Sequence, residues 1–169
     1  MAVEAGAALW SAFTARAELL GAAVMRTASQ DTAVSLLHEA TSGYTCTRSA
    51  AARFPRVAAG ASTDGVDNVV AAAEFAVAET GSVAINEPAD DRGRCFLAER
   101  LWLLVPEWAL VADLEVGLRR IGDLIRSGAR HPLLMSGPSR TADIERILTI
   151  GVHGPRALVI VVVGAAAQS

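Results

Sequence analysis

Two stretches of this chain, Leu101–Val105 and Ala157–Val163, are apolar at every position. A strand with one face in water alternates apolar and polar residues, so continuous apolar runs indicate strands buried on both faces. Between them lie an amphipathic segment, Leu114–Arg126, preceded by the candidate N-cap Asp113, and a third apolar run, Leu133–Met135. This alternation predicts an α/β fold with a mostly parallel sheet that is covered on both faces.

The remaining pattern is less regular. Apolar residues at helical spacing predict a helix over Ala7–Leu20, and Ser29, Asp31 and Thr32 are candidate N-caps of a second helix. The size of the chain predicts a single domain over residues 1–169. We expect strands at Ala22–Arg26, Tyr44–Thr47, Arg56–Ala59, Phe75–Ala78 and Ser82–Ile85, short helices at Val66–Ala73 and Ala142–Leu148, and a polar loop over Asn86–Arg94.

Composition excludes several classes of function. Hydrophobic residues make up 52% of the chain and charged residues 20%, which is typical of a globular protein and not of a disordered one. The net charge is −3 and no basic tract occurs, so nucleic acid is not an expected partner. All 15 basic residues are arginine, which excludes Schiff-base, pyridoxal-phosphate and Walker A lysines.

The cysteines and histidines do not predict a metal centre. Cys46 and Cys95 have no partner at metal-ligand or redox spacing, and two thiols cannot hold a four-cysteine iron–sulfur cluster. His38, His131 and His153 also lack the spacing of a zinc site. We therefore expect no metal and two reduced thiols, which suit the cytoplasm.

The sequence predicts no membrane segment. The longest apolar run, Ala157–Ala167, is shorter than a membrane-spanning helix requires. The N-terminus lacks a basic region before an apolar one, so we expect no signal peptide.

The strongest candidate site follows the run Leu133–Met135. There the chain reads SGPSRTADIE, Ser136–Glu145, a small polar loop that enters the expected helix. The free N–H groups of a helix's first turn bind anions, and a guanidinium such as that of Arg140 suits a carboxylate or phosphate. The alternative is a capped helix start in which Arg140 is solvated or pairs with Asp143 or Glu145.

Two further places can carry chemistry. His153 precedes Gly154-Pro155 and the last strand, where a tight turn can orient it as an acid or base, or as a structural hydrogen-bond donor. Glu79-Thr80-Gly81-Ser82 offers a carboxylate and two hydroxyls, or else a hairpin turn whose carboxylate pairs with an arginine. No GxSxG or GxGxxG motif occurs.

The strings SGPSRTADIE…GVHGP and AETGSV together resemble the signature of the LUD-domain family, in its lactate-utilisation protein C branch. The resemblance extends from about Val66 to Val163, whereas the segment Tyr44–Gly65 looks shortened relative to the family. It implies a three-layer α/β/α sandwich similar to the fold of ribose-5-phosphate isomerase and the coenzyme A transferases. We expect catalytic roles for His153, Glu79 and Asp143, and ligand binding by Thr80, Gly81, Ser136, Gly137, Ser139, Arg140, Thr141 and Gly154.

The resemblance implies an accessory protein of L-lactate oxidation to pyruvate. It would act with iron–sulfur partner proteins that carry the clusters, while this chain binds no cofactor. A small anionic ligand would meet Arg140 through its carboxylate, and His153 would accept the hydroxyl proton. Two alternatives stay open: a stand-alone acyl/CoA-transferase-like or phosphosugar-isomerase-like enzyme that uses Glu79 or Asp143, and a vestigial or regulatory homologue. The sequence does not decide whether the chain is an enzyme.

Overall fold

Eight strands of the chain form one twisted sheet, in the order β1-β10-β5-β3-β4-β7, with β2 and β6 also paired to β3. The computed structural model describes residues 2–62, 67–138, 140–141, 149–150 and 154–164. Five of the seven pairings are parallel, and only β3–β4 and β4–β7 are antiparallel. The strands are β1 (Ala23–Thr27), β2 (Thr45–Cys46), β3 (Asn68–Val77), β4 (Ser82–Ile85), β5 (Arg100–Pro106), β6 (Leu110–Val111), β7 (Leu133–Met135) and β10 (Ala157–Val163), beside a separate ribbon of β8 (Arg140–Thr141) and β9 (Thr149–Ile150).

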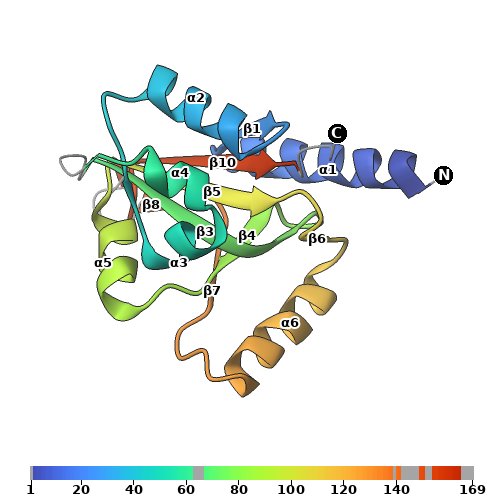
Figure 1. Ribbon diagram of the computed structural model, residues 1–169. Coiled ribbons are helices and arrows are strands. Elements are labelled where there is room, and N and C mark those ends of the chain that lie inside the picture. The colour runs from blue at the N-terminus through green and yellow to red at the C-terminus, as the bar shows by residue number, and fades with distance from the viewer. Residues whose placement is uncertain (1, 63–66, 139, 142–148, 151–153, 165–169) are drawn as a thin grey trace.

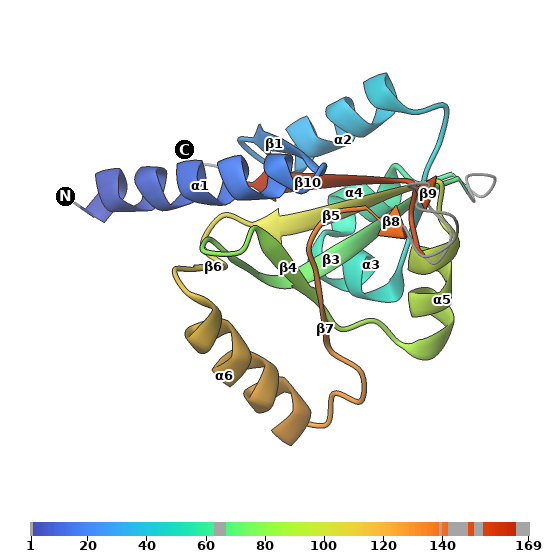
Figure 2. The same ribbon diagram turned by 180° about the vertical axis from the view of Figure 1, so that it is seen from behind.

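Helices cover both faces of this sheet, which confirms the predicted three-layer α/β/α fold (Figures 1 and 2). Buried residues of α1 and α5 belong to the cluster on one face, and those of α2, α3 and α4 belong to the cluster on the other. Helix α6 packs beside them, over Phe75 and Val77 of β3. The helices are α1 (Ala2–Leu19), α2 (Gln30–Ala40), α3 (Arg48–Arg53), α4 (Pro55–Ala59), α5 (Ala89–Leu97) and α6 (Leu114–Arg126).

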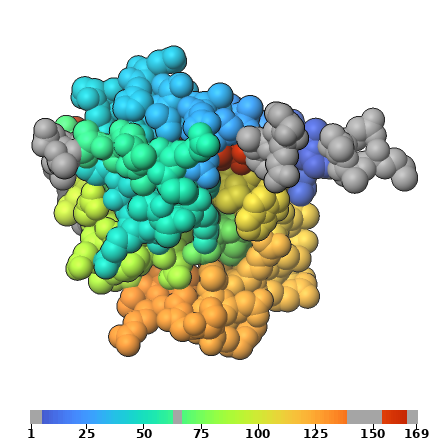
Figure 3. Space-filling view, in the orientation of Figure 1, coloured from blue at the N-terminus to red at the C-terminus, as the bar shows by residue number. Residues whose placement is uncertain are grey.

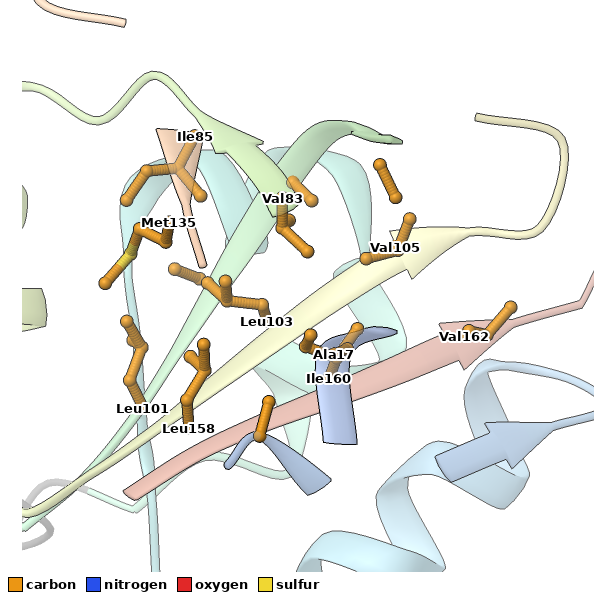
Figure 4. Close-up of a cluster of buried hydrophobic side chains, with 14 of the residues drawn as sticks. Ala17, Val83, Ile85, Leu101, Leu103, Val105, Met135, Leu158, Ile160 and Val162 are labelled. Carbon is orange, nitrogen blue, oxygen red and sulfur yellow. The ribbon is translucent and has the colours of Figure 1, made fainter. Parts of the chain in front are cut away.

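The two apolar runs are buried on both faces, as their composition predicts. In β5, Leu101 and Leu103 pack toward α1 while Trp102 and Leu104 pack toward α2–α4. Strand β10 alternates in the same way. Figure 4 shows side chains of β4, β5, β7 and β10 on the face of the sheet where Ala17 of α1 also lies. Because each side chain of the two apolar runs lies against one helical layer or the other, no position in these runs favours a polar residue.

A β-bulge divides β3 into two halves. The pairing of β3 with β4 shifts between Ala73 and Phe75. The first half pairs with β2 and β5, and the second half pairs with β4 and β6. The extra residue lets Val70 and Ala72, before the bulge, share a face with Phe75, after it. The long strand thereby carries the parallel part of the sheet into the β4–β7 extension.

Three of the expected elements were wrong. Arg56–Ala59 is not a strand, because Pro55 starts the short helix α4 there. Val66–Ala73 was expected to be helical, yet Asn68–Val77 forms β3, since pairing on both edges overrides alanine's helix propensity. The polar stretch Asn86–Arg94 contains most of α5, which begins after Pro88.

Two helix starts agree with their predicted caps. The Asp113 side chain accepts a hydrogen bond from the Val116 N–H at 2.8 Å, and the Ser29 side chain accepts one from the Thr32 N–H at 3.3 Å. Both bonds satisfy an N–H group that has no partner within its helix. In the part of the chain that is described, none of the helices combines the length and the apolar character needed to cross a membrane.

Candidate functional site

The two motif segments meet at one edge of the sheet. Strand β4 is antiparallel to β3 and β7 is antiparallel to β4, so β7 runs in the same direction as β3. The carboxyl ends of β3 and β7 therefore point to the same edge, and β4 begins there. The turn Ala78–Gly81 follows β3, and the loop that begins at Ser136 follows β7. In open α/β sheets this is the edge at which ligands bind.

A hydrogen bond between two hydroxyls joins the segments. Ser82 Oγ lies 2.6 Å from Ser136 Oγ, across 54 positions of sequence. Ser82 is buried at the start of β4, whereas Ser136 is exposed. Either hydroxyl can donate, so the pair keeps one proton and several lone pairs for another group. The structure thus brings together Ser136, a predicted ligand-binding residue, and Ser82, from the motif that begins at Ala78.

Thr80 contributes a hydroxyl of a different kind to the same turn. Its Oγ1 is buried and has no hydrogen-bond partner. A buried polar atom without a partner costs about 1–3 kcal/mol, so folded proteins rarely retain one without a reason. A predicted ligand-binding residue therefore offers an unused donor and acceptor two positions before Ser82.

Gly81 and Gly137 hold this edge against α1. Both glycines have positive φ, 66° and 105°. A Cβ at Gly81 would lie 2.5 Å from the Ala17 nitrogen, and a Cβ at Gly137 would lie 2.5 Å from the Leu20 carbonyl oxygen. The space beside both glycines is thus filled by α1 and the turn after it. Their role in the structure is to allow close packing; ligand binding by their backbone stays a prediction.

Glu79 acts as a helix cap in the structure. Its Oε2 accepts a hydrogen bond from the Leu114 N–H, at the first residue of α6, at 2.8 Å. The partner is a backbone N–H group, where the sequence interpretation expected an arginine. The exposed carboxylate also lines a cavity of about 520 Å³ beside Arg16. A carboxylate at the start of a helix is favoured by the helix dipole. The predicted catalytic role of Glu79 stays a prediction.

The loop after Ser136 does not lead directly into a helix. Arg140 and Thr141 form β8, which pairs antiparallel with β9. The backbone of these two residues, which directly precede the expected helix Ala142–Leu148, is thus extended. The predicted residues Ser139, Asp143 and His153, and the expected helix Ala142–Leu148, lie outside the described residues. Gly154 is buried, shortly before β10.

A second polar cluster lies at the other end of the β4–β7 pair. Its centre is Glu87, which is 4% exposed and accepts a hydrogen bond from Thr47 Oγ1 at 2.9 Å. Asp91, also buried, accepts bonds from the Arg48 side chain at 2.8 Å and from Arg94 at 3.3 Å. These bonds join the N-termini of α3 and α5. Neither carboxylate was singled out in the sequence, although Pro88 before Asp90 and Asp91 is a helix-start signal.

Burial separates the two carboxyl groups of this cluster. The pKa of Glu87 is raised, first by burial and then by the charge of Asp91, against the lowering effects of hydrogen bonds from the Thr47 and Ser49 side chains and the Ala72 backbone. Burial also acts to raise the pKa of Asp91, but the hydrogen bonds and charge of Arg48 outweigh it and lower that pKa. The pKa values of the two buried carboxyl groups at this end of the sheet therefore shift in opposite directions.

The cysteines are not reactive groups in this structure. Both are free, and Cys95 is fully buried while Cys46 is half-buried. Burial raises the pKa of Cys46 to about 11 and that of Cys95 to about 12, so both thiols are protonated at neutral pH. Among the described residues there is no group of three or more His, Cys, Asp and Glu side chains that could hold a metal ion.

Known proteins share this architecture. A solved DUF162 family protein from Deinococcus radiodurans matches 94% of this chain and 98% of its own chain, with a TM-score of 0.70 and 20% identity. At that identity the match establishes the fold alone. It agrees with the mostly parallel sheet between helical layers described above.

Sequence comparison reaches the family. Lactate utilization protein C of Deinococcus radiodurans is 34% identical over 107 residues, which are 62% of this chain and 50% of that protein. Lactate utilization protein C of Geobacillus thermodenitrificans is 33% identical over 99 residues, 56% of this chain and 41% of that protein. The uncharacterized protein YkgG of Escherichia coli is 36% identical over 94 residues, 49% and 38% of the two chains. The chain thus spans half or less of the length of these relatives.

The family model settles the assignment. The LUD domain model matches residues 49–163, more than half of the chain, and this range contains both motif segments that meet at Ser82 and Ser136. The chain belongs to the LUD-domain family, in the branch of lactate utilization protein C.

Proposed function

We propose that this chain acts in the utilisation of L-lactate and binds a small carboxylate or phosphate at the edge formed by the β3–β4 turn and the loop after β7. The names of its relatives support the pathway. The clusters needed for oxidation to pyruvate would reside on iron–sulfur partner proteins, because two cysteines cannot hold a four-cysteine cluster.

One observation carries the location of the site. Ser82 and Ser136, from two motif segments distant in sequence, are hydrogen-bonded at the edge where open α/β sheets bind ligands. In the same turn, Thr80 Oγ1 is buried without a partner. A ligand oxygen that bonded to Thr80 would satisfy this hydroxyl and recover the free energy that its burial costs.

The roles follow from the chemistry of each side chain. Thr80 and Ser136 provide neutral hydrogen bonds, and Ser82 orients Ser136. Arg140 holds the carboxylate through its planar fork, and His153 accepts the proton of the substrate hydroxyl.

The test is lactate-dependent dye reduction in extracts of a host that lacks this gene, with purified protein added back. Wild type should restore activity, and Arg140→Ala and His153→Ala should each reduce it by at least about tenfold. Arg156→Ala is the matched control: this exposed arginine is paired with Glu99 at 3.3 Å before β10 and should retain full activity. Full activity of both test variants would refute the assigned roles.

Thr80→Val separates ligand binding from folding. Valine has nearly the shape of threonine but removes the unpartnered hydroxyl, so the variant should be at least as stable as wild type. If Thr80 binds the ligand, the stable variant should still lose activity. Equal activity of Thr80→Val and wild type would remove Thr80 from the site.

The stand-alone enzyme and the vestigial homologue predict different results. Turnover of an acyl-CoA or a sugar phosphate by the purified chain alone would favour the former. Activity that does not depend on the added protein would favour the latter.

A further inference from the structure

A second cavity lies at the opposite end of the β4–β7 pair from the Ser82–Ser136 edge. It has a volume of about 500 Å³ and is bounded by the N-terminal ends of α3 and α5 and by the connection from α6 to β7. Figure 3 shows the orange surface of that connection below the turquoise surface of α3 and the lime surface of α5. The cavity is lined by Ser49, Asn86, Glu87, Pro88, Ala89 and the segment 128–131.

One wall of this cavity carries a buried acid with an unused oxygen. Glu87 is 4% exposed, and Thr47 donates to its Oε1. Its other oxygen, Oε2, is buried without a hydrogen-bond partner. A second donor is therefore missing from this wall, and supplying it would satisfy an atom whose burial is otherwise unfavourable.

The neighbouring acids do not compete for that donor. Asp91 is held by Arg48 and Arg94, and Asp90 lies 3.8 Å from the Arg48 guanidinium. Glu87 is thus the buried carboxyl group of this cluster that has no charged partner. Its partners on the protein side, the Thr47 and Ser49 hydroxyls and the Ala72 backbone, are neutral, so an ionised Glu87 gains most from a cation.

The rest of the cavity favours a negative charge. Helix α5 has Pro88 at its N-cap and no side-chain cap, and its first backbone bond runs from the Arg92 N–H to the Pro88 carbonyl. The N–H groups of Ala89 and the next residues are therefore free of helical partners. Arg130 and His131 line the same cavity as this helix start. Free N–H groups at a helix N-terminus and a guanidinium are a fitting set for a carboxylate.

We propose that this cavity binds a small amino-acid-like zwitterion, with its ammonium group on Glu87 and its carboxylate between the α5 N-terminus and Arg130. A simple anion would leave Glu87 Oε2 unsatisfied. A simple amine would leave the positive wall unused. Only a molecule with both groups matches both walls, and this assignment does not rest on the proposed role in lactate utilisation.

The experiment uses the purified chain and its three histidines. Each standard amino acid is first screened at millimolar concentration for a rise in Tm. The best of them is then titrated while the imidazole resonances are followed by NMR, with His131 assigned from a His131→Asn variant. The same titration is repeated with the deaminated acid and the decarboxylated amine of that amino acid.

The expected result is a saturable shift of the His131 resonance with the amino acid, and binding at least about tenfold weaker for both analogues. Glu87→Gln and Arg130→Gln should each weaken binding by at least about tenfold. Arg126→Gln is the matched control, because Arg126 is exposed on α6 and paired with Asp123; it should bind as wild type.

Three results would overturn the proposal. No standard amino acid raises the Tm or moves the His131 resonance; the deaminated acid binds as tightly as the amino acid; or Glu87→Gln binds as wild type. The last result would place the ligand away from the buried carboxyl even if a cavity ligand exists.

Discussion

The strands β4 and β7 end in two polar clusters that are held in different ways. At the Ser82–Ser136 end the groups are neutral hydroxyls, and glycines allow the backbone of α1 to pack against them. At the Glu87 end the groups are carboxylates and guanidiniums joined across α3 and α5. The two ends are about 13 Å apart, given a rise of about 3.3 Å per residue from Ser82 to Asn86.

The difference shows how one strand pair can position two kinds of chemistry. Steric contact fixes the first end, so its geometry should be insensitive to pH and salt. Charge pairing fixes the second end, so its geometry should depend on the protonation of Glu87 and Asp91. Substitutions at matched positions of the two ends distinguish these cases.

The largest expected effect is at a glycine. Gly137 and Gly128 have nearly the same φ, 105° and 104°, but a Cβ at Gly137 would meet the Leu20 carbonyl at 2.5 Å whereas nothing lies within 4 Å at Gly128. Gly128→Ala should cost about 1–2 kcal/mol of unfolding free energy, and Gly137→Ala about 4 kcal/mol or more. Urea denaturation measures both. Equal losses of stability would show that the Leu20 carbonyl, in the turn after α1, does not exclude a side chain at position 137.

Next in size is the loss of the buried partner of Arg48. Asp91→Ala removes the carboxylate that accepts hydrogen bonds from the Arg48 side chain, the Arg94 side chain and the Arg48 backbone N–H. The substitution should lower the free energy of unfolding by about 2 kcal/mol. Asp90→Ala is the control: its exposed carboxylate lies 3.8 Å from Arg48, and its loss should cost less than about 0.5 kcal/mol. A cost for Asp91→Ala as small as that of Asp90→Ala would mean that charge pairing does not hold the Glu87 end.

The hydroxyl pair at the other end should contribute less. A double-mutant cycle of Ser82→Ala and Ser136→Ala, followed by urea denaturation, should give a coupling free energy of about 1 kcal/mol. That value should be the same at low and high salt, since neither group is charged. A coupling near zero would remove the contact that joins the two motif segments.

The smallest expected effect is a pH dependence of stability that involves the Glu87 end and not the Ser82–Ser136 end. The pKa of Glu87 is raised in the folded state, so its proton is retained there when the unfolded chain has already lost it. The stability that this group contributes is present below its unfolded pKa and is lost as pH rises through its folded pKa. The stability of Glu87→Gln relative to wild type should therefore increase from about pH 4 to about pH 7.

Thermal unfolding across that range measures the difference between the two proteins. Ser136→Ala is the control, and its difference from wild type should not change with pH. A constant difference for Glu87→Gln would contradict the raised pKa.

The local sequence predicted the parts of the fold that local pattern controls. Helix α6 has the expected bounds and cap, and β5 and β10 were predicted because their residues are apolar on both faces. The prediction failed where partners distant in sequence decide. The alanines of β3 favour a helix by themselves, and only pairing with β2, β4, β5 and β6 makes them a strand.

The candidate site divides in the same way. The motifs predicted which residues matter at the edge near Ser136, because glycine, hydroxyl and arginine residues cluster there in sequence. They did not predict that Ser82 bonds to Ser136 or that α1 fills the space beside Gly81 and Gly137. Both contacts join segments more than 50 positions apart, and no local rule specifies such a distance.

The sequence by itself determined the α/β class through the periodicity of its apolar runs. Its motifs indicated the family, the three-layer arrangement that the family implies, and the chemical character of the motif edge. Tertiary structure alone decided that β7 pairs antiparallel with β4 at the edge of the sheet. It also decided that Glu87 is buried with one oxygen unpaired. The physical reason is that burial, and the pKa shift it causes, depend on which segments pack together. A carboxylate in a polar stretch of sequence carries no sign of its solvation until α3 and α5 close over it.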